Sequence, residues 1–293
     1  MTTGLTIGAV ASRTSVSVPV LRAWELRYGF PRPDRAVSGH RRYSERDVEL
    51  IMRVVRERQA GLSLEAAIER VRRADDEPVP SIFAGLRRHR ADLPIHLLPK
   101  PSMLAISHAI EDECCARAER PVLVASFQKV GYYLDARRRW HDLAVTASRV
   151  IAFADFDEAR EAPNGILEVP IADDAPLRRE WSVVCDAPGA AAVLTGWERP
   201  GQEGVPENRR MFEAVWSAEP ALVRRATQVG VALAHRRAPG LAGLDGIDDL
   251  LADHPDASVD PTEVVHRATA LTNRIVAYLD GDARRARRPK LRT

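Results

Sequence analysis

The stretch that decides the fold is Leu21–Pro33, LRAWELRYGFPRP, together with Gly39–Ser44, GHRRYS. Leu21 and Trp24 lie at helical spacing, and Gly29 is a residue type that commonly ends a helix. The prolines that follow exclude a continued helix, and the glycine of the second run marks a turn between arginine-bearing arms. The pattern predicts a helix followed by a short basic hairpin with its turn near residues 38–39.

The residues before this stretch predict another helix. Ile7 and Val10 recur at helical spacing, and Arg13 is expected to end the segment. Ser17 is suited to cap the next helix, and Pro19 is tolerated in a first turn because its missing N–H would be unpaired there. Two short helices joined by a tight turn predict a helix-turn-helix, whose second helix enters a DNA major groove.

The expected DNA contacts lie on the second helix and on the hairpin. Guanidinium groups and phenol hydroxyls donate hydrogen bonds to phosphate oxygens, which suits the arginines and the tyrosine of the hairpin. For any single arginine, a solvated surface charge is the alternative interpretation. The full set of expected DNA-binding residues is Ser17, Val18, Arg22, Arg27, Arg32, Arg35, His40, Arg41, Arg42 and Tyr43.

Two further helices are expected to complete this domain. Ser44 and Asp47 form a capping-box variant that opens a helix, which Gly61 interrupts. Ser63 is placed to cap the next one. The predicted fold of residues 1–75 is an all-α winged helix-turn-helix with a small β-wing.

Residues 5–74 strongly resemble the winged helix-turn-helix domain of MerR-type transcriptional regulators. The resemblance implies that the helix containing Arg22 enters the major groove, and that Arg35, Arg41 and Tyr43 contact the DNA backbone. It also implies a homodimer on a pseudo-palindromic promoter site, which underwinds and bends the spacer for RNA polymerase. The residues in family register are Ile7-Gly8, Val16, Leu21-Arg22, Trp24-Glu25, Tyr28-Gly29, Pro33, Arg35, Gly39, Arg41 and Tyr43.

The sequence departs from many members of that family after the helix-turn-helix. Arg72-Arg73 leads into the polar, proline-containing run 75–80, and neither a heptad run nor a cysteine cluster follows. We therefore expect no metal site and no metal-sensing role. The chain also lacks the Asp/Glu-x-His-x-x-Gly motif of related cobalamin photoreceptors, so no cofactor is expected.

Composition limits the remaining possibilities. Residues 1–75 carry fourteen arginines and nine acidic residues, although the 293-residue chain has a net charge of only +2. The placement of arginine is more informative than its abundance, which a GC-rich genome also explains. There is no charged leader with an apolar core, and no apolar run of membrane-spanning length. We expect a cytoplasmic, nucleoid-associated protein without membrane contact.

The rest of the chain mixes helix and strand signals. A short helix is expected at 81–90, an extended piece at 95–98, and a long helix from Ser102 through Arg117. Two closing helices are expected at 210–235 and 262–279. The order lacks a strict βαβ repeat and predicts an α+β domain with a mostly antiparallel sheet. Its expected strands are 122–127, 150–154, 167–171, 181–185 and 192–197, the last two as a hairpin.

Residues of roughly 95–235 resemble the DICT domain, a sensory module found beside MerR-type domains. The resemblance implies sensing without naming a ligand, and it rests on 101–107, 110–113, Phe127-Gln128 and 176–181. The expected organisation is a DNA-binding domain at 1–75, a linker at 76–94, a sensory domain at 95–235, a helical extension at 236–280 and a basic disordered tail at 281–293.

Candidate chemistry in this part is limited. Phe127, Tyr132, Tyr133 and Trp140, beside the arginines 137–139, are candidates for a pocket that takes an anionic aromatic ligand. The alternative is a set of core aromatics beside a solvated charge run. The run 111–113 is either an acidic pocket edge, a cation site or a solvated helix face. Cys114-Cys115 is either a redox sensor or a small buried residue with an incidental neighbour. Trp181, Trp197 and Trp216 are expected in the core.

These observations favour a regulator that binds duplex DNA as a homodimer under the control of an unknown effector or signalling partner. One alternative is a second domain that docks a signalling protein and takes no small ligand. Another is a DNA-tethered enzyme, which the sequence disfavours because no motif places a nucleophile, a base and an acid together.

Overall fold

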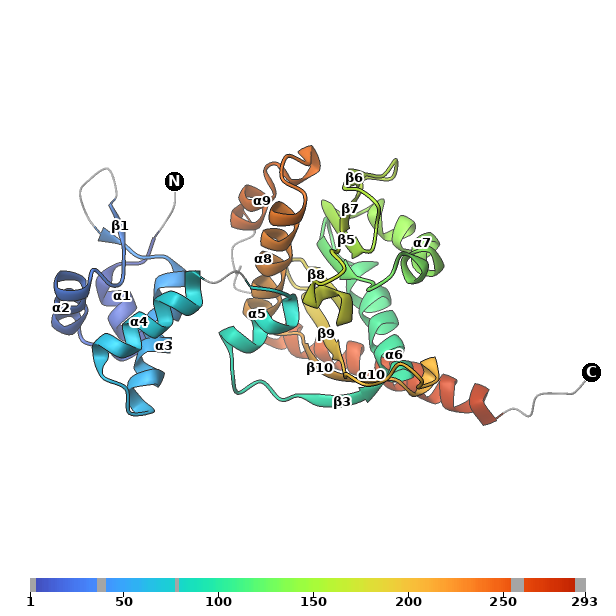
Figure 1. The fold of residues 1–293 in the computed structure, drawn as a ribbon, viewed down its shortest axis with the longest axis horizontal. Coiled ribbons are helices and arrows are strands. Elements are labelled where there is room, and N and C mark those ends of the chain that lie inside the picture. The colour runs from blue at the N-terminus through green and yellow to red at the C-terminus, as the bar shows by residue number, and fades with distance from the viewer. Residues whose placement is uncertain (1–3, 36–40, 77–78, 254–260, 288–293) are drawn as a thin grey trace, which may run out of the picture. The chain divides into compact units, whose positions relative to one another are not determined.

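The protein, as a computed structural model, is described over residues 4–35, 41–76, 79–253 and 261–287. Its contacts separate two compact units, Met1–Pro78 and Val79–Thr293 (Figure 1). The boundary falls within the polar run that the sequence marks as a linker. Each unit has its own hydrophobic core, so each is described by itself.

The first unit is the predicted helical domain with a small wing. Its helices are α1 (Ile7–Thr14), α2 (Val18–Tyr28), α3 (Glu45–Gln59) and α4 (Leu64–Asp76). The antiparallel pair β1 (Asp34–Arg35) and β2 (Arg41–Arg42) forms the arms of the hairpin. The expected turn at residues 38–39 lies outside the described residues. The predicted capping box is confirmed, since the Ser44 hydroxyl and the Asp47 carboxylate bond reciprocally to each other's amides.

The second unit is built on one eight-stranded sheet, in the order β3-β10-β9-β8-β4-β5-β7-β6. Only β4-β5 and β5-β7 pair in parallel, which confirms the predicted mostly antiparallel sheet. The expected hairpin is present as β8-β9. The strands are β3 (His96–Pro99), β4 (Val122–Ser126), β5 (Arg149–Ala154), β6 (Arg160–Glu161), β7 (Ile166–Pro170), β8 (Glu180–Asp186), β9 (Ala192–Glu198) and β10 (Met211–Ser217).

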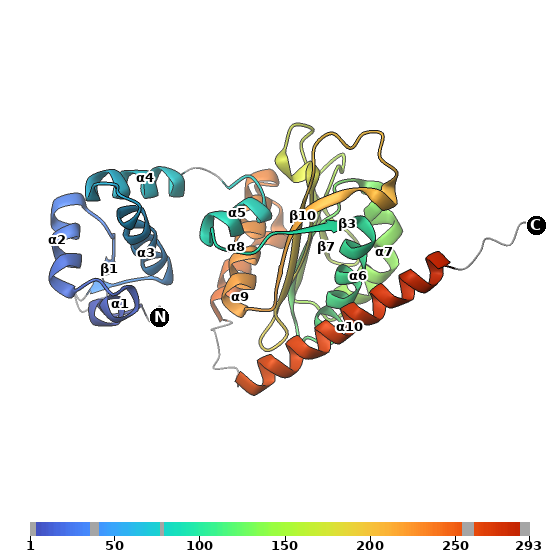
Figure 2. The same cartoon turned by 90° about the horizontal axis from the view of Figure 1, so that it is seen from below.

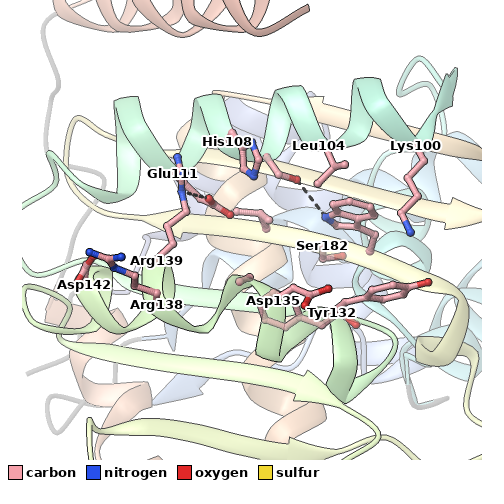
Figure 3. Close-up of a pocket in the computed structure, with 16 residues that line it drawn as sticks. Lys100, Leu104, His108, Glu111, Tyr132, Asp135, Arg138, Arg139, Asp142 and Ser182 are labelled. Carbon is pink, nitrogen blue, oxygen red and sulfur yellow. Dashed lines mark hydrogen bonds and ion pairs between the residues drawn. The ribbon is translucent and has the colours of Figure 1, made fainter. Parts of the chain in front are cut away.

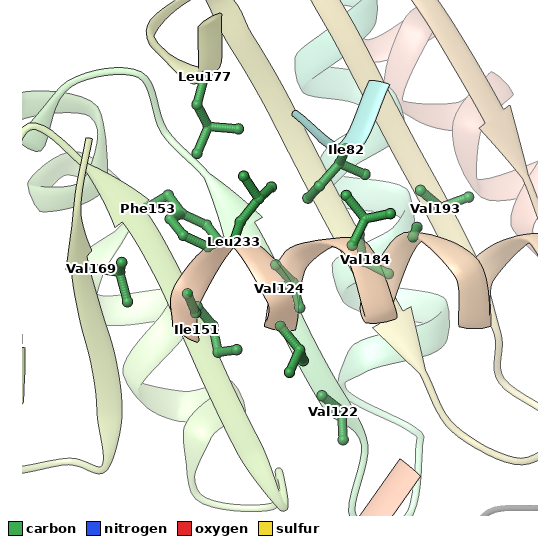
Figure 4. Close-up of a cluster of buried hydrophobic side chains, with 14 of the residues drawn as sticks. Ile82, Val122, Val124, Ile151, Phe153, Val169, Leu177, Val184, Val193 and Leu233 are labelled. Carbon is green, nitrogen blue, oxygen red and sulfur yellow. The ribbon is translucent and has the colours of Figure 1, made fainter. Parts of the chain in front are cut away.

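Helices cover both faces of this sheet, as the edge-on view shows (Figure 2). One face packs against α5 (Ile82–His89), α8 (Pro220–Arg237) and α9 (Ile247–Asp253), and the cluster in Figure 4 fills this layer. The other face lies under α6 (Lys100–Ile110) and α7 (Val130–Ala144), and α10 (Pro261–Arg287) packs on α6. The strands alternate between the two cores, so Val122 and Val124 face α8 whereas Leu123 and Ala125 face the opposite side.

Two predicted helices differ in the structure. The segment expected to be one helix at 210–235 is strand β10 followed by α8, because residues 211–217 pair with both β3 and β9. Trp216 lies on this strand and is 37% exposed, so its expected burial is wrong. The helix expected to start at Ser102 begins at Lys100, with Pro101 in its first turn.

The predicted ends of the second unit also shift. Residues 82–89 of the expected linker form α5, and Ile82 and Leu86 are fully buried in the core. The expected helical extension is part of the same unit, since Leu271 and Ile275 of α10 pack in its second core. Helix α10 continues to Arg287, so disorder from residue 281 is wrong for residues 281–287. Residues 288–293 lie outside the described residues.

Candidate nucleic-acid interface and a cavity in the second unit

Helix α2 is held by its apolar face and presents its basic face. Leu21 and Trp24 are buried in the first unit's core, whereas Arg22 and Arg27 are exposed. Ser17 occupies the predicted N-cap position, although its side chain makes no capping bond. The hydroxyl of an exposed Ser17 at the start of α2 is therefore available to an outside partner, as is expected at the N-terminal end of a groove-reading helix.

The other end of α2 is fixed by an arginine that sequence reasoning missed. Gly29 ends the helix with a positive φ of 59°, a conformation that favours glycine. Arg72 of α4 donates from Nη2 to the carbonyl oxygens of Tyr28 at 2.6 Å and Gly29 at 2.7 Å. A cation at this position satisfies exposed carbonyls and opposes the negative end of the helix dipole. Arg72 therefore orients α2 without lying on it.

Glu25 of α2 connects the helix to the wing. Its carboxylate accepts a hydrogen bond from Arg41 Nε of β2 at 2.7 Å, and a second one from the Tyr43 hydroxyl. Tyr43 is buried, and burial together with the Glu25 carboxylate raises the pKa of its phenol. Because the hydroxyl already donates to Glu25 inside the unit, we expect Tyr43 to hold the wing and not to contact phosphate, which differs from the role expected from the sequence.

The other hairpin residues expected to contact DNA are placed as follows. Arg32 is exposed just before β1, and Arg42 is partly buried on β2. Arg35 lies on β1, and His40 falls outside the described residues. Val18 is partly buried in the first turn of α2. The structure thus brings Arg22, Arg27 and the arginines of the wing onto two adjoining elements.

The second unit contains a cavity of about 610 Å³ between α6 and α7, above strands β4 and β8 (Figure 3). Residues one turn apart on α6 form one wall, and α7 forms the facing wall. Trp181 closes the cavity from β8, and its indole Nε1 donates to Ser107 Oγ at 3.1 Å. The lining residues used below are Lys100, Leu104, Glu111, Phe127, Tyr132, Asp135, Arg138, Arg139, Asp142 and Trp181.

The four candidate pocket aromatics separate into two pairs. Phe127 and Tyr132 line the cavity. Tyr133 and Trp140 are buried in the core, and the Tyr133 hydroxyl donates to Glu168 at 2.9 Å. Tyr132 and Tyr133 are consecutive residues of α7, and they differ because neighbouring positions on a helix point about 100° apart. The pocket role expected for Tyr133 and Trp140 is therefore corrected to core packing.

The acidic run 111–113 is an ion-pair cluster and not a solvated helix face. It lies in a π-helical turn, Glu111–Cys115, which directly continues α6. Arg139 of α7 pairs with both Glu111 and Asp112, and the Tyr278 hydroxyl donates to Asp112. Burial raises the pKa of Glu111 to about 7, against the opposing effect of Arg139. Turns of π-helix often occur at functional sites, and this one places a buried carboxyl at the end of the cavity.

The cysteines do not form a reactive site. Cys114, Cys115 and Cys185 are buried and free. Burial raises the pKa of the Cys114 thiol to about 12, and a hydrogen bond with Cys185 together with burial raises that of Cys115. Since the thiolate is the reactive form, the structure favours the interpretation of small buried residues. Within the described ranges, no three histidine, cysteine or acidic side chains are grouped so that they could hold a metal ion.

The arrangement of the first unit, an exposed basic helix beside a basic hairpin, defines a winged helix-turn-helix DNA-binding domain. Comparison with known proteins agrees. Residues 5–74 match the MerR HTH family regulatory proteins, and residues 81–199 match DICT, described as a sensory domain in diguanylate cyclases and two-component systems. The chain thus joins a MerR-type helix-turn-helix domain to a DICT sensory domain.

The curated relatives are similar over short segments of the chain. The chain is 44% identical over 70 residues to the HTH-type transcriptional repressor CarA of Myxococcus xanthus, covering 23% of this chain and 24% of CarA. It is 36% identical over 61 residues to the repressor CarH of the same organism, covering 21% and 20%. It is 39% identical over 51 residues to the HTH-type transcriptional regulator MlrA of Salmonella typhimurium, covering 17% and 21%.

The chain therefore spans no more than about a quarter of the length of these relatives. The matches support a DNA-binding regulator. In the described parts of the chain, no helix is both long and apolar enough to cross a membrane.

Proposed function

We propose that the protein is a homodimeric transcriptional regulator that distorts a promoter spacer under the control of its second unit. The observation that carries the proposal is the presentation of α2. Its apolar side is locked into the core by Leu21 and Trp24, its end is held by Arg72, and its exposed side carries Arg22 and Arg27. A rigid basic helix beside a basic wing suits major-groove entry with phosphate contacts on either side.

A stripe on α10 supports the homodimer. Val265, Thr269, Thr272, Val276 and Leu279 are all exposed and alternate at spacings of four and three residues, the a/d pattern of a coiled coil. The hydroxyls of Thr269 and Thr272 donate back to carbonyls of α10, each at 2.8 Å. These bonds satisfy the two hydroxyls within α10 itself, so neither threonine needs a polar partner from outside.

The occupant that fits this stripe is α10 of a second copy. A coiled-coil seam needs a partner helix with the same repeat, and a twofold axis supplies one with matching spacing. Leu271 and Ile275, by contrast, are committed to the protein's own core.

Control by the second unit is supported by the way α5 is held. This helix is the first element after the linker, and it begins at Ile82. The buried Glu180 of β8 accepts the amides of Ile82 at 3.1 Å and Phe83 at 2.8 Å. A change in β8 would thus reach the segment from which the DNA-binding unit is tethered.

The proposed partners are duplex DNA with a pseudo-palindromic site, RNA polymerase at the distorted promoter, and an effector of the second unit. Two of the relatives are named as repressors and one as a regulator, so these names fit either repression or activation of transcription. The proposed location is the cytoplasm, on the nucleoid. The cavity favours a small effector over a purely protein-docking second unit.

The test is to select genomic fragments with the purified full-length protein and to sequence them. The proposal expects an inverted repeat inside promoter spacers to be enriched. It also expects the protein to slow the gel migration of circularly permuted fragments, which is the sign of DNA distortion. Arg22→Ala is expected to lose the enrichment. Recovery of DNA without a shared site would contradict the proposal.

A further inference from the structure

We propose that the cavity between α6 and α7 binds an organic cation, an amphipathic amine whose apolar body lies against Trp181 and Leu104 and whose ammonium group lies near Glu111. The inference rests on the proposed sensory role of the second unit and names the chemistry of its effector. It differs from the anionic aromatic ligand that the arginine run 137–139 suggests.

The size and walls of the cavity fit a small organic molecule. A volume of about 610 Å³ is in the range of cavities that enclose drug-sized ligands. In the close-up, Leu104 projects from α6 between Lys100 and Glu111 (Figure 3), and Trp181 lines the same cavity. The apolar part of a ligand therefore has a defined place, with a polar group of the protein at either end.

Two of the cationic groups that line the cavity are already neutralised. Lys100 is ion-paired with Glu207, and its ammonium lies 4.2 Å from the centre of the Tyr132 ring. Arg139 is shared between the two carboxylates of Glu111 and Asp112. Neither cation has an unmatched charge to offer to a ligand anion.

Carboxylates are in excess on the same walls. Asp135 and Asp142 of α7 both line the cavity, and no described group pairs with either carboxylate. Arg138 is the lining guanidinium without a described partner. Two carboxylates without a described partner therefore face one guanidinium without a described partner. At the Glu111 end, this lining carboxylate and the adjacent Asp112, which does not line the cavity, together hold the one guanidinium of Arg139. A bound ammonium group would supply the missing positive charge there.

Desolvation strengthens this preference at Glu111. The side chain is only 5% exposed, and an ionised carboxylate in such a place gains more from a nearby cation than one in water. An anionic ligand would instead add a third negative group beside Glu111 and Asp112. Aromatic faces at Trp181 and Tyr132 also attract cations over anions.

The test uses three probes that share one ring system and differ in charge, namely tryptamine, indole-3-acetate and 3-methylindole. Binding to the full-length protein is measured by saturation-transfer NMR and by calorimetry. We expect tryptamine to bind at least several-fold more tightly than the other two. Glu111→Gln should abolish the difference between tryptamine and 3-methylindole, and Glu119→Gln, an exposed carboxyl outside the cavity, should preserve it.

Equal or tighter binding of indole-3-acetate would overturn the inference, as would the absence of binding by any probe. Unchanged tryptamine preference in a folded Glu111→Gln variant would place the site elsewhere. If that variant does not fold, Asp135→Asn takes its place, because this exposed side chain supports no internal contact. DNA binding is measured on the same samples, so failure of the ligand inference with DNA binding intact leaves the proposed function standing.

Discussion

Glu180 and Trp181 are consecutive residues of β8 that act on opposite faces of the sheet. The Trp181 ring lines the cavity and its Nε1 donates to Ser107 of α6. The Glu180 carboxylate lies on the other face, where it accepts two amides at the start of α5 and the Ser182 hydroxyl at 2.8 Å. The period of two along a strand thus links the cavity to the helix that follows the linker.

Removal of the Glu180 carboxylate is expected to loosen α5. In Glu180→Ala, the amides of Ile82 and Phe83 lose their acceptor in a buried place, which costs about 2 to 4 kcal/mol in the free energy of unfolding. Chemical denaturation of the full chain measures this loss. The matched change Glu203→Ala, at an exposed loop position, should cost almost nothing. A loss below about 0.5 kcal/mol for Glu180→Ala would show that the carboxylate does not hold the helix.

Arg22 and Tyr43 are expected to respond differently although both belong to the candidate interface. Arg22→Ala should weaken binding to the selected site by about 1 to 3 kcal/mol if the side chain reads a base. Tyr43→Phe should leave site affinity nearly unchanged and lower the free energy of unfolding by about 1 kcal/mol, since only the bond to Glu25 is lost. Fluorescence anisotropy and denaturation distinguish the two. A large loss of DNA affinity in Tyr43→Phe would show that the Tyr43 hydroxyl contacts the DNA backbone.

Arg72 is expected to affect DNA binding without touching DNA. Arg72→Met keeps the apolar stem and removes the donor to the carbonyls of Tyr28 and Gly29, so the end of α2 should fray. We expect a loss of about 1 kcal/mol in unfolding free energy and a weaker specific complex. Unchanged salt dependence of binding is the control, because a lost phosphate contact would reduce the slope by about one.

The buried Glu111 carboxyl predicts a pH dependence of stability. Burial raises its pKa to about 7 in the folded protein from 4.5, while Arg139 opposes the shift. The folded state therefore binds this proton more tightly than the unfolded state. The resulting stability is fully present below about pH 4.5 and is lost as the pH rises through about 7. Glu111→Gln should flatten the stability curve between those values, and an equally steep curve in the variant would assign the dependence to other groups.

The stripe on α10 predicts a clear effect of one substitution on association. Val276→Glu places a charge within the proposed seam and should convert the dimer to a monomer with the fold intact. Ala277→Glu adds the same charge one residue further, about 100° around the helix, and should leave the dimer in place. Sedimentation velocity measures the association state of both variants. A dimer that survives Val276→Glu would move the interface to another surface.

The sequence predicts local features of this fold better than their long-range consequences. The helix-turn-helix follows from spacing, caps and turn residues within some forty positions, and the end of α2 at Gly29 and the Ser44–Asp47 capping box were confirmed. The strand at 211–217 was missed because its identity depends on pairing with two strands, one of them more than a hundred positions away. Local periodicity cannot reveal such pairing.

The candidate sites show the same division. Exposed arginines on α2 could be predicted from helical spacing, whereas the internal role of Tyr43 depends on Glu25, eighteen positions earlier. The cavity wall on α6 has a readable signal, since Lys100, Leu104 and Glu111 recur on one helical face. Which aromatics of α7 face that wall depends on the rotation of the helix on the sheet, which the sequence does not specify.

The most direct test of the central claim is a footprint of the purified protein on promoter DNA at low and at near-physiological salt. A dimeric regulator that reads sequence through α2 should protect two symmetric half-sites across a promoter spacer at both salt concentrations, and Arg22→Ala should lose this protection. Weak protection that is indifferent to sequence, vanishes at the higher salt concentration and is the same in Arg22→Ala would contradict the claim.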